Sequence, residues 1–170
     1  MTDIRRFYTL IAAVFISVCW LSCDRQKDPC LQPVRASLHI GVYKTVESDT
    51  GIVALDSLLP NVIVGVVDSP AYFMYAVKNV NKIDSVVLSP MKDSTSIFIQ
   101  ADSARTSVFD KDTITFYYTR NLHFISNACG YTTYYTISDL KYTVNNIDSV
   151  KLINGNVSTD ANIEHVKIYY

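Results

Sequence analysis

The sequence predicts an all-β protein: an antiparallel sandwich of two β-sheets, immunoglobulin-like in outline, with about eight to ten strands. Apolar and polar residues alternate along many short runs, which is typical of half-buried strands. These runs are rich in Val, Ile, Thr, Tyr and Phe, the residues that suit a pleated surface. Turn-forming residues separate the runs, and no long helical period follows residue 33. A closed β-barrel of about eight strands is the alternative.

The alternation is clearest in three runs. In the first, Leu38, Ile40 and Val42 occupy alternate positions. The second spans residues 113–119 and the third residues 165–170. Further strand-like runs occupy residues 61–67, 71–77, 83–88, 94–100, 122–126, 132–137 and 148–153. Turn-forming residues, which set the strand boundaries, lie at 47–51, 68–70, 79–81, 145–146 and 154–156.

The N-terminal stretch has the parts of an export signal. Arg5 and Arg6 supply positive charge, and residues 7–21 are nearly all apolar. This run is shorter than the about 20 residues that cross a bilayer as a helix. The small residue Ser22 then precedes Cys23, and a charged stretch follows. The whole resembles a bacterial lipoprotein signal peptide, which implies removal of everything before the cysteine and attachment of lipid to it.

Two positions depart from the usual lipoprotein pattern. That pattern has an aliphatic and a small residue before Gly, Ala or Ser, whereas Trp20 and Leu21 stand here. An uncleaved N-terminal anchor helix is therefore the alternative. With cleavage, we expect three parts: a lipoprotein signal peptide at 1–22, a lipidated tether at 23–34 and the sandwich domain at 35–170.

The charge of the mature chain is close to balanced. Removing the signal leaves 13 Lys and Arg against 15 Asp and Glu, from 15 and 16 in the full chain. There is no basic stripe and no basic amphipathic helix, so nucleic acid is not an expected partner. The expected partners are the membrane, reached through the lipid, and an envelope protein or a glycan.

The cysteines predict one disulfide bond. Cys19 leaves with the signal, and Cys23 takes the lipid. Cys30 and Cys129 remain, in a compartment that oxidises thiols. There is no Cys-x-x-Cys motif and no zinc-ligand spacing. We therefore expect the two remaining cysteines to pair, with Gly130 permitting a turn or bulge beside the bond.

No motif for catalysis or for a cofactor stands out. His39, His123 and His165 fall on separate runs, so we expect exposed or strand-edge side chains and no metal site. The aspartates mostly lie in turns, and no two are marked as an acid–base pair. A Gly-x-Ser-x-Gly frame and a glycine-rich phosphate loop are both missing. We expect no enzyme, no catalytic residue and no cofactor.

One tripeptide recurs: Asp, then Ser or Thr, then an apolar residue. It resembles the acceptor motif for O-glycosylation of exported Bacteroidota proteins. The same residues also form turns that lead into strands. The candidate acceptor hydroxyls are those of Ser57, Ser85, Ser103, Thr113 and Ser149.

Four stretches of the mature chain resemble a family of uncharacterised Bacteroidota lipoproteins, a domain of unknown function. They are Asp28-Pro-Cys30, the run at 112–120, Ala128-Cys-Gly-Tyr-Thr-Thr-Tyr134 and Glu164-His-Val-Lys-Ile-Tyr-Tyr170. The likeness runs from about Cys30 to the last residue. It supports both the lipoprotein interpretation and the paired cysteines, and it implies no activity.

Two classes of function remain. The first, which we favour, is a lipid-anchored protein of the outer membrane, on its periplasmic or cell-surface face, that serves as a non-enzymatic structural or interaction module. The alternative binds a glycan or another small ligand through exposed aromatic rings, for which 72–75, Tyr134 and Tyr135 are candidates. Packing within the sheets is the simpler role for these rings.

Overall fold

The computed structural model describes residues 29–48, 51–67, 74–102 and 111–170. All the strands of the described ranges lie in one compact unit, Leu31–Tyr170. Within the described ranges the secondary structure is entirely β, and the strands divide into two sheets. The predicted two-sheet sandwich is confirmed, and the alternative of a single closed sheet is not formed.

The described ranges contain eleven strands, against the predicted eight to ten. They are β1 (Leu38–Ser48), β2 (Gly51–Asp56), β3 (Leu59–Val66), β4 (Met74–Val80), β5 (Lys82–Val86), β6 (Ser94–Gln100), β7 (Lys111–Ser126), β8 (Gly130–Tyr142), β9 (Ser149–Leu152), β10 (Asn156–Val157) and β11 (Val166–Tyr169). Sequence periodicity missed β2 and the short β10. It also predicted separate runs at 113–119 and 122–126, which the structure joins into the single long strand β7.

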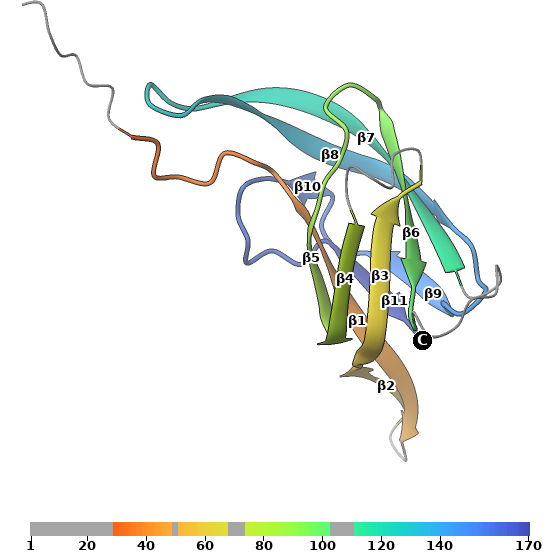
Figure 1. Ribbon diagram of the computed structural model, residues 1–170. Helices are drawn as coiled ribbons and strands as arrows, with labels where there is room; N and C mark the ends of the chain where they lie inside the picture. Colours follow the sequence, from red (N-terminus) through yellow and green to blue (C-terminus); the bar gives the residue numbers. More distant parts are fainter. Residues whose placement is uncertain (1–28, 49–50, 68–73, 103–110) are drawn as a thin grey trace, which may run out of the picture. The chain divides into compact units, whose positions relative to one another are not determined.

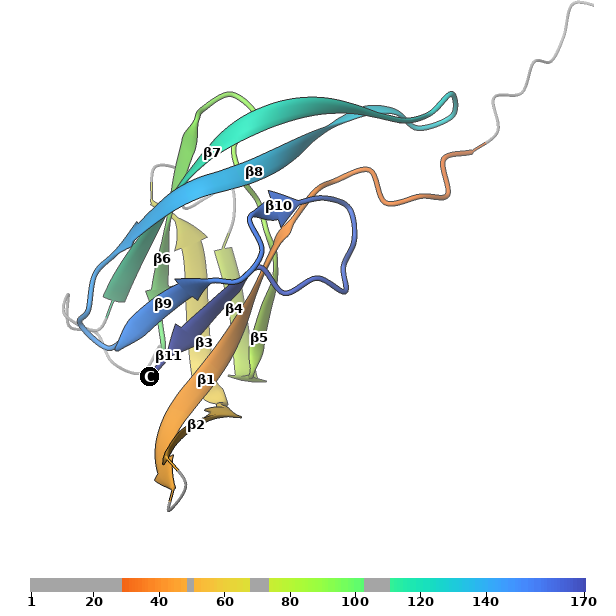
Figure 2. The same cartoon turned by 180° about the vertical axis from the view of Figure 1, so that it is seen from behind.

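Each sheet combines segments that are far apart in the sequence. The five-stranded sheet has the order β2-β1-β11-β9, and β5 also pairs with β1. The six-stranded sheet has the order β10-β8-β7-β6-β3-β4. Figure 1 shows the long β7–β8 hairpin of the second sheet, and Figure 2 shows β1, β11 and β9 side by side in the first.

One strand pair departs from the predicted antiparallel arrangement. β1 and β11 are parallel, with Ile40 opposite Val166 and Val42 opposite Ile168. All the other pairs of named strands in the described ranges are antiparallel. The parallel pair places the last strand of the chain beside the first, so residues near positions 40 and 166 become neighbours.

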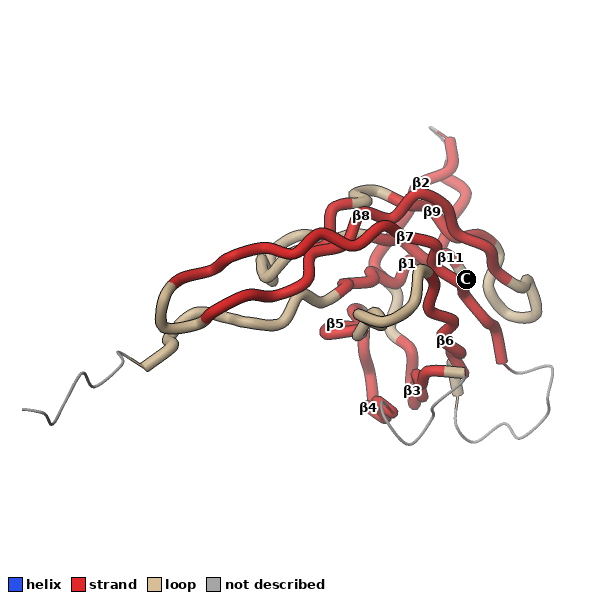
Figure 3. The backbone as a smooth tube through the Cα atoms, turned by 90° about the horizontal axis from the view of Figure 1, so that it is seen from above, coloured by secondary structure: helices blue, strands red, loops and turns tan. Residues whose placement is uncertain are grey.

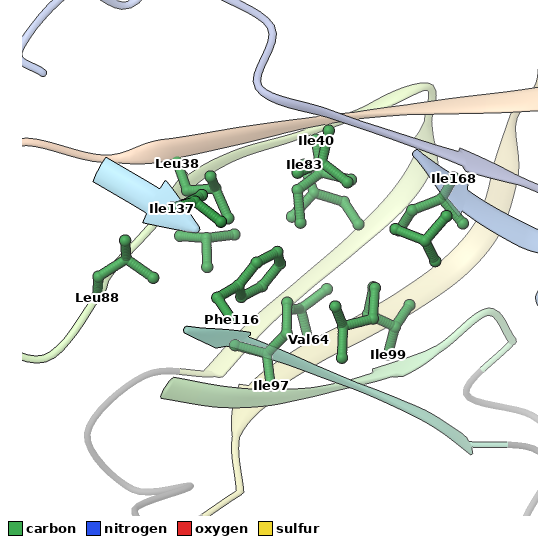
Figure 4. Packing of buried hydrophobic residues seen from close by; sticks show 14 of the residues in the cluster. Leu38, Ile40, Val64, Ile83, Leu88, Ile97, Ile99, Phe116, Ile137 and Ile168 are labelled. Carbon is green, nitrogen blue, oxygen red and sulfur yellow. The ribbon is translucent and has the colours of Figure 1, made fainter. Parts of the chain in front are cut away.

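The core lies between the two sheets, as the alternation predicts. Leu38, Ile40 and Val42 are all at most 1% exposed on β1. From the facing sheet, Phe116 is fully buried, and Figure 4 shows its ring among aliphatic side chains of both sheets. Removing such a ring costs about 3–5 kcal/mol, because the cavity left behind cannot fully close. Phe116 is therefore a major contributor to the stability of the sandwich.

A buried carboxylate fixes the connection between β8 and β9. Asp112, on β7, is 1% exposed. Its Oδ1 accepts hydrogen bonds from the Thr143 hydroxyl at 2.8 Å and from the Asn145 N–H at 2.7 Å. Its Oδ2 accepts from the Asn146 and Ile147 N–H groups at 2.8 and 3.0 Å. One side chain thus satisfies three backbone donors that have left the sheet.

Candidate functional site

The β7–β8 hairpin continues beyond the strands that flank it. The two strands pair with each other up to the turn that joins them. β6 accompanies β7 only as far as Tyr117, and β10 pairs with β8 only at residues 135–136. Residues 121–134, which we call the arm, therefore form a two-stranded ribbon. Figure 3, seen from above, shows it projecting beyond the two sheets.

The arm carries exposed apolar side chains on one face. Leu122 is opposite Thr133 and Phe124 is opposite Tyr131, and directly opposed side chains share a face. The exposed fractions of Leu122, Phe124 and Tyr131 are 74%, 48% and 65%. The rings of Phe124 and Tyr131 lie 5.1 Å apart between centroids. The pairing of β7 with β8 has no register shift between Tyr118 and Phe124. The side chains of Leu122 and Phe124 therefore lie on the same face of the hairpin as the buried Tyr118, but beyond the end of the core.

Charged side chains are missing from the arm and return at its base. The sequence from 121 to 138 contains no Asp, Glu, Lys or Arg. Immediately before it, Arg120 forms an ion pair with Asp93, Nη2 to Oδ1 at 2.8 Å, and donates from Nη1 to the Pro90 carbonyl at 2.9 Å. These contacts attach the base of the arm to the segment that precedes β6, and the Asp93 carboxylate balances the charge of Arg120, which shares the face of Tyr118 and Leu122.

A disulfide bond joins the turn of the arm to Cys30. Cys30 and Cys129 are disulfide-bonded, which confirms the predicted pair. The Cys129 N–H donates to the Ser126 hydroxyl at 3.1 Å, and Gly130 has a φ of +74°. A side chain is strained in this left-handed region, so glycine suits the turn as predicted.

Two hollows of about 290 and 330 Å³ lie at the base of the arm. Val87, Leu88 and Pro90 line both of them. Two tyrosines fix this shared segment: the Tyr118 hydroxyl donates to the Ser89 carbonyl at 3.0 Å, and the Tyr135 hydroxyl donates to the Leu88 carbonyl at 3.1 Å. Burial raises the pKa of Tyr118, so the phenol stays protonated and keeps its role as donor.

His39 and His165 form a buried pair, which the sequence did not predict. They are 3% and 0% exposed, and their rings stack with centroids 5.6 Å apart. The expectation of exposed or edge histidines is wrong for these two and correct for His123. Alternation along one strand shows that His39 faces away from the core, but it does not show what covers that face. The parallel β1–β11 pair brings the two rings together, and the Asn156 carbonyl lies 3.2 Å from His165 Nε2.

The hydrogen bonds of His165 define its protonation. Its Nδ1 accepts from the backbone N–H of His39 at 3.1 Å, so the proton of the neutral ring sits on Nε2. Nε2 then donates to the Asn156 carbonyl. Burial lowers the pKa of His165, and the neighbouring His39 lowers it further. The ring is therefore a neutral structural group between β1 and β10.

His39 links a hydroxyl to a carboxylate. Its Nε2 lies 3.3 Å from Ser37 Oγ, and its Nδ1 lies 2.9 Å from Asp84 Oδ1, which also pairs with Lys82 at 3.2 Å. The order hydroxyl, imidazole, carboxylate is that of a hydrolase triad. Here, however, the imidazole is almost completely covered, and Ser37 lines neither hollow. We assign these contacts to satisfying the polar groups of a buried imidazole.

The candidate glycosylation sites differ in their surroundings. Ser85 and Ser149 are exposed, and Ser57 and Thr113 are partly buried. Ser103 lies outside the described ranges. The attachment of a glycan to any of these hydroxyls stays a prediction.

Two of the rings considered for an aromatic platform, those of Tyr134 and Tyr135, lie in different surroundings. Tyr135 belongs to the core, where its ring meets Tyr118 edge-on at 5.2 Å between centroids. Tyr134 stacks on His123 at 4.2 Å, and its hydroxyl lies 3.2 Å from that of Thr159. Of the other candidate stretch, residues 72 and 73 lie outside the described ranges. Tyr134 and Tyr135 thus have the packing role that we considered simpler.

Sequence reasoning missed the exposed apolar face of the arm. It predicted strands at 122–126 and 132–137 but assigned them to a sandwich, where such side chains are covered. The usable signal was the lack of any charge between 121 and 138, in a stretch where Leu122 and Phe124 alternate with polar residues. In the part of the chain that the structure describes, no cluster of three metal-ligating side chains occurs. Nor does any helix there have the length and apolarity to cross a membrane.

The fold and the site define a small all-β domain, a two-sheet sandwich with a disulfide-linked apolar arm. The profile of a family of unknown function, DUF6452, matches residues 62–170. The match covers more than half of the chain, which therefore belongs to this family. It includes most of β3, the whole arm and the strands that follow. Comparison with curated proteins and comparison with solved structures give no significant match.

Proposed function

We propose that this protein is a lipoprotein of the bacterial envelope, attached to the outer membrane through Cys23, and that it serves as a non-enzymatic structural or interaction module. The observation that carries the proposal is the N-terminal sequence. Arg5 and Arg6 precede an apolar run at 7–21, and the small residue Ser22 follows it immediately before the cysteine. This order of charge, apolar segment and small residue is typical of an exported chain. Cys23 itself lies outside the described ranges.

The disulfide bond supports export. Bonds of this kind persist in oxidising compartments such as the periplasm and the cell surface, and they are rare in the cytosol. The bond between Cys30 and Cys129 leaves no other thiol downstream of Cys23. The chain beyond the proposed cleavage point thus has one cysteine for lipid and one pair for a disulfide.

The lipid would provide the attachment by itself. Each buried methylene group contributes about 0.8 kcal/mol, and stable anchoring requires more than one acyl chain. The diacylated or triacylated cysteine of bacterial lipoproteins meets that requirement. The folded domain is then free to present its surface to something other than the anchor.

The arm supports a role in contact rather than in catalysis. Exposed apolar side chains that are contiguous mark surfaces that meet another surface. Leu122, Phe124 and Tyr131 form such a group, and the register of the hairpin places them on one face. The buried polar contacts of His39 and His165, in contrast, are satisfied within the fold.

Substitution of the lipidated residue tests the proposal. Cys23→Ser should abolish incorporation of a labelled fatty acid and release the protein from the membrane fraction, because serine has no thiol to acylate. Cys19→Ser is the matched control, since the same atom changes four residues upstream, in the part that should be removed. It should leave labelling and fractionation unchanged. Mature-sized Cys23→Ser protein that still fractionates with membranes would contradict the lipid anchor.

A further inference from the structure

We propose that the apolar face of the arm lies in the surface of the membrane that carries the protein. The domain then contacts the bilayer at two points, the lipid on Cys23 and the side chains of the arm. The inference rests on the proposed lipid anchor and adds to it a lipid-binding surface within the folded domain. The contacting side chains are those of Leu122, Phe124 and Tyr131 on the arm, with Leu31 beside the disulfide bond.

The covalent structure holds the arm near the anchor. The turn of the arm contains Cys129, which is bonded to Cys30. From Cys30 back to Cys23 the chain has seven steps. Fully extended, they span at most about 25 Å. The turn of the arm therefore stays within roughly that distance of the lipidated residue, which is less than the about 30 Å thickness of the hydrocarbon core.

This short linkage favours the membrane over a soluble partner. Linking one binding element to a site that is already occupied makes the second contact intramolecular, with an effective concentration on the order of millimolar for a short linker. A few exposed apolar side chains bind a bilayer weakly by themselves. Beside a lipid anchor, the same side chains are presented to the surface continuously.

The chemistry of the arm suits the interface between lipid and water. Leucine and phenylalanine gain free energy from contact with acyl chains, and tyrosine suits the level of the headgroups because its hydroxyl stays wet. Leu31 and Val34, which follow the bonded Cys30 in the sequence, are 89% and 47% exposed, and Val34 lines a hollow together with Thr132 and Thr133 of the arm. With no Asp, Glu, Lys or Arg between 121 and 138, the arm itself has no charge to be desolvated, and Arg120 at its base is paired with Asp93.

The β1–β2 hairpin also has exposed apolar side chains, but charged side chains lie among them. Val53 and Leu55 on β2 are 42% and 52% exposed. Charged Lys44 lies opposite Leu55, and Glu47 lies on the same strand as Lys44. Inserting this hairpin into a bilayer would require desolvation of those charges. Leu55 therefore provides a matched control position: apolar, exposed and on a hairpin, but flanked by charge.

The test uses the full-length lipidated protein in phosphatidylcholine vesicles whose acyl chains carry bromine, a short-range quencher of tryptophan. Trp20 is the chain's sole tryptophan, and it leaves with the signal peptide, so one introduced tryptophan is a unique probe. Phe124→Trp and Tyr131→Trp place the probe on the arm at exposed positions, and Leu55→Trp places it on the control hairpin. We expect both arm probes to be quenched several-fold more than the control probe. Added salt and anionic lipid should not change the result, because the contact is apolar.

The possible results separate the two proposals. Vesicle flotation of the wild-type protein reports the anchor alone. If the protein floats but the arm probes are quenched no more than the Leu55→Trp probe, the membrane contact of the arm is overturned and the anchor stands. Arm probes with blue-shifted emission but no quenching, together with dimers in sedimentation, would overturn it in favour of contact with a second copy. Failure of the wild-type protein to float would overturn both.

Discussion

His165 is kept neutral by the contacts that bury it. Its Nδ1 faces a backbone N–H and its Nε2 faces a carbonyl, so a second ring proton would have to point at a donor. Burial is the largest cause of its lowered pKa, and the nearby His39 and Lys82 act in the same direction. Hydrogen bonding to Asn156 and the charge of Asp160 oppose the shift without reversing it.

The lowered pKa of His165 predicts a loss of stability in mild acid. The ordinary value is 6.5, so below that pH the unfolded chain binds a proton that the folded protein resists. The contribution is complete above pH 6.5 and is lost as the pH falls toward the lowered pKa of the folded state. Between the two pKa values, the free energy of unfolding can fall by up to about 1.4 kcal/mol per pH unit. His165→Gln, which keeps one acceptor and one donor, should flatten the dependence of the unfolding free energy on pH in this range.

The exposed His123 provides the control for that measurement. Denaturant unfolding of wild-type protein, His165→Gln and His123→Gln at several pH values between about 5 and 8 separates the two histidines. His123→Gln should follow the wild-type slope. If His165→Gln also keeps the wild-type slope, the neutral buried ring is not the cause of acid sensitivity.

Single residues show where sequence patterns stop being informative. The alternation correctly placed Leu38, Ile40 and Val42 in the core. The same pattern put His39 on the opposite face and gave no means of predicting that this face is covered. Burial there depends on β10 and β11, more than 100 residues away, and no local period contains that information.

At the scale of elements, Asp112 holds the β8–β9 connection. Its two oxygens accept three backbone N–H bonds and one hydroxyl bond, all from residues 143–147. Hydrogen bonds to charged groups contribute about 1.5–3 kcal/mol each, and a buried donor left without a partner carries a comparable penalty. No sequence pattern indicated this role: Asp112 immediately precedes the strand-like run at 113–119, in a tripeptide that we interpreted as a turn or a glycosylation motif.

We expect Asp112→Ala to lower the free energy of unfolding by about 2–4 kcal/mol, because four donors lose their acceptor and part of the space fills with water. Asp112→Asn should cost less, since one carbonyl oxygen stays. The exposed Asp139, which accepts one bond from the adjacent Leu140 N–H, is the control. Asp139→Ala should change stability by less than about 0.5 kcal/mol. Equal denaturation midpoints for Asp112→Ala and Asp139→Ala would contradict this account.

The strands themselves were largely predictable, and their lengths and partners were not. Period-2 runs identified β1, β3, β6 and β11, because one face of each strand meets the core. The arm was predicted as strand but not as an arm, since alternation does not say whether a neighbouring strand exists. The parallel pairing of β1 with β11 likewise depends on the path of the whole chain.

At the scale of the whole molecule, the two-sheet architecture follows from composition and turn spacing, whereas the arm and the order of the strands follow from tertiary pairing alone. The disulfide bond is the exception among long-range contacts. It was predictable because the proposed export and lipidation leave two thiols with no other partner. The number of available thiols thus predicted the bond between Cys30 and Cys129, which no hydrophobic pattern predicts.

Loss of this bond should destabilise the whole domain. Cys30 and Cys129 are 99 positions apart, and closing a loop of that length restricts the unfolded chain by about 4–5 kcal/mol in the chain-entropy description. This is comparable to the net stability of a small domain, about 5–15 kcal/mol. Cys30→Ser should therefore unfold at a much lower denaturant concentration than wild-type protein under non-reducing conditions. Adding a reductant should bring the wild-type midpoint down to that of the variant. Cys23→Ser, which removes a thiol outside the pair, is the control and should unfold at the wild-type midpoint. If Cys30→Ser also unfolded at the wild-type midpoint, the bond would contribute nothing to stability.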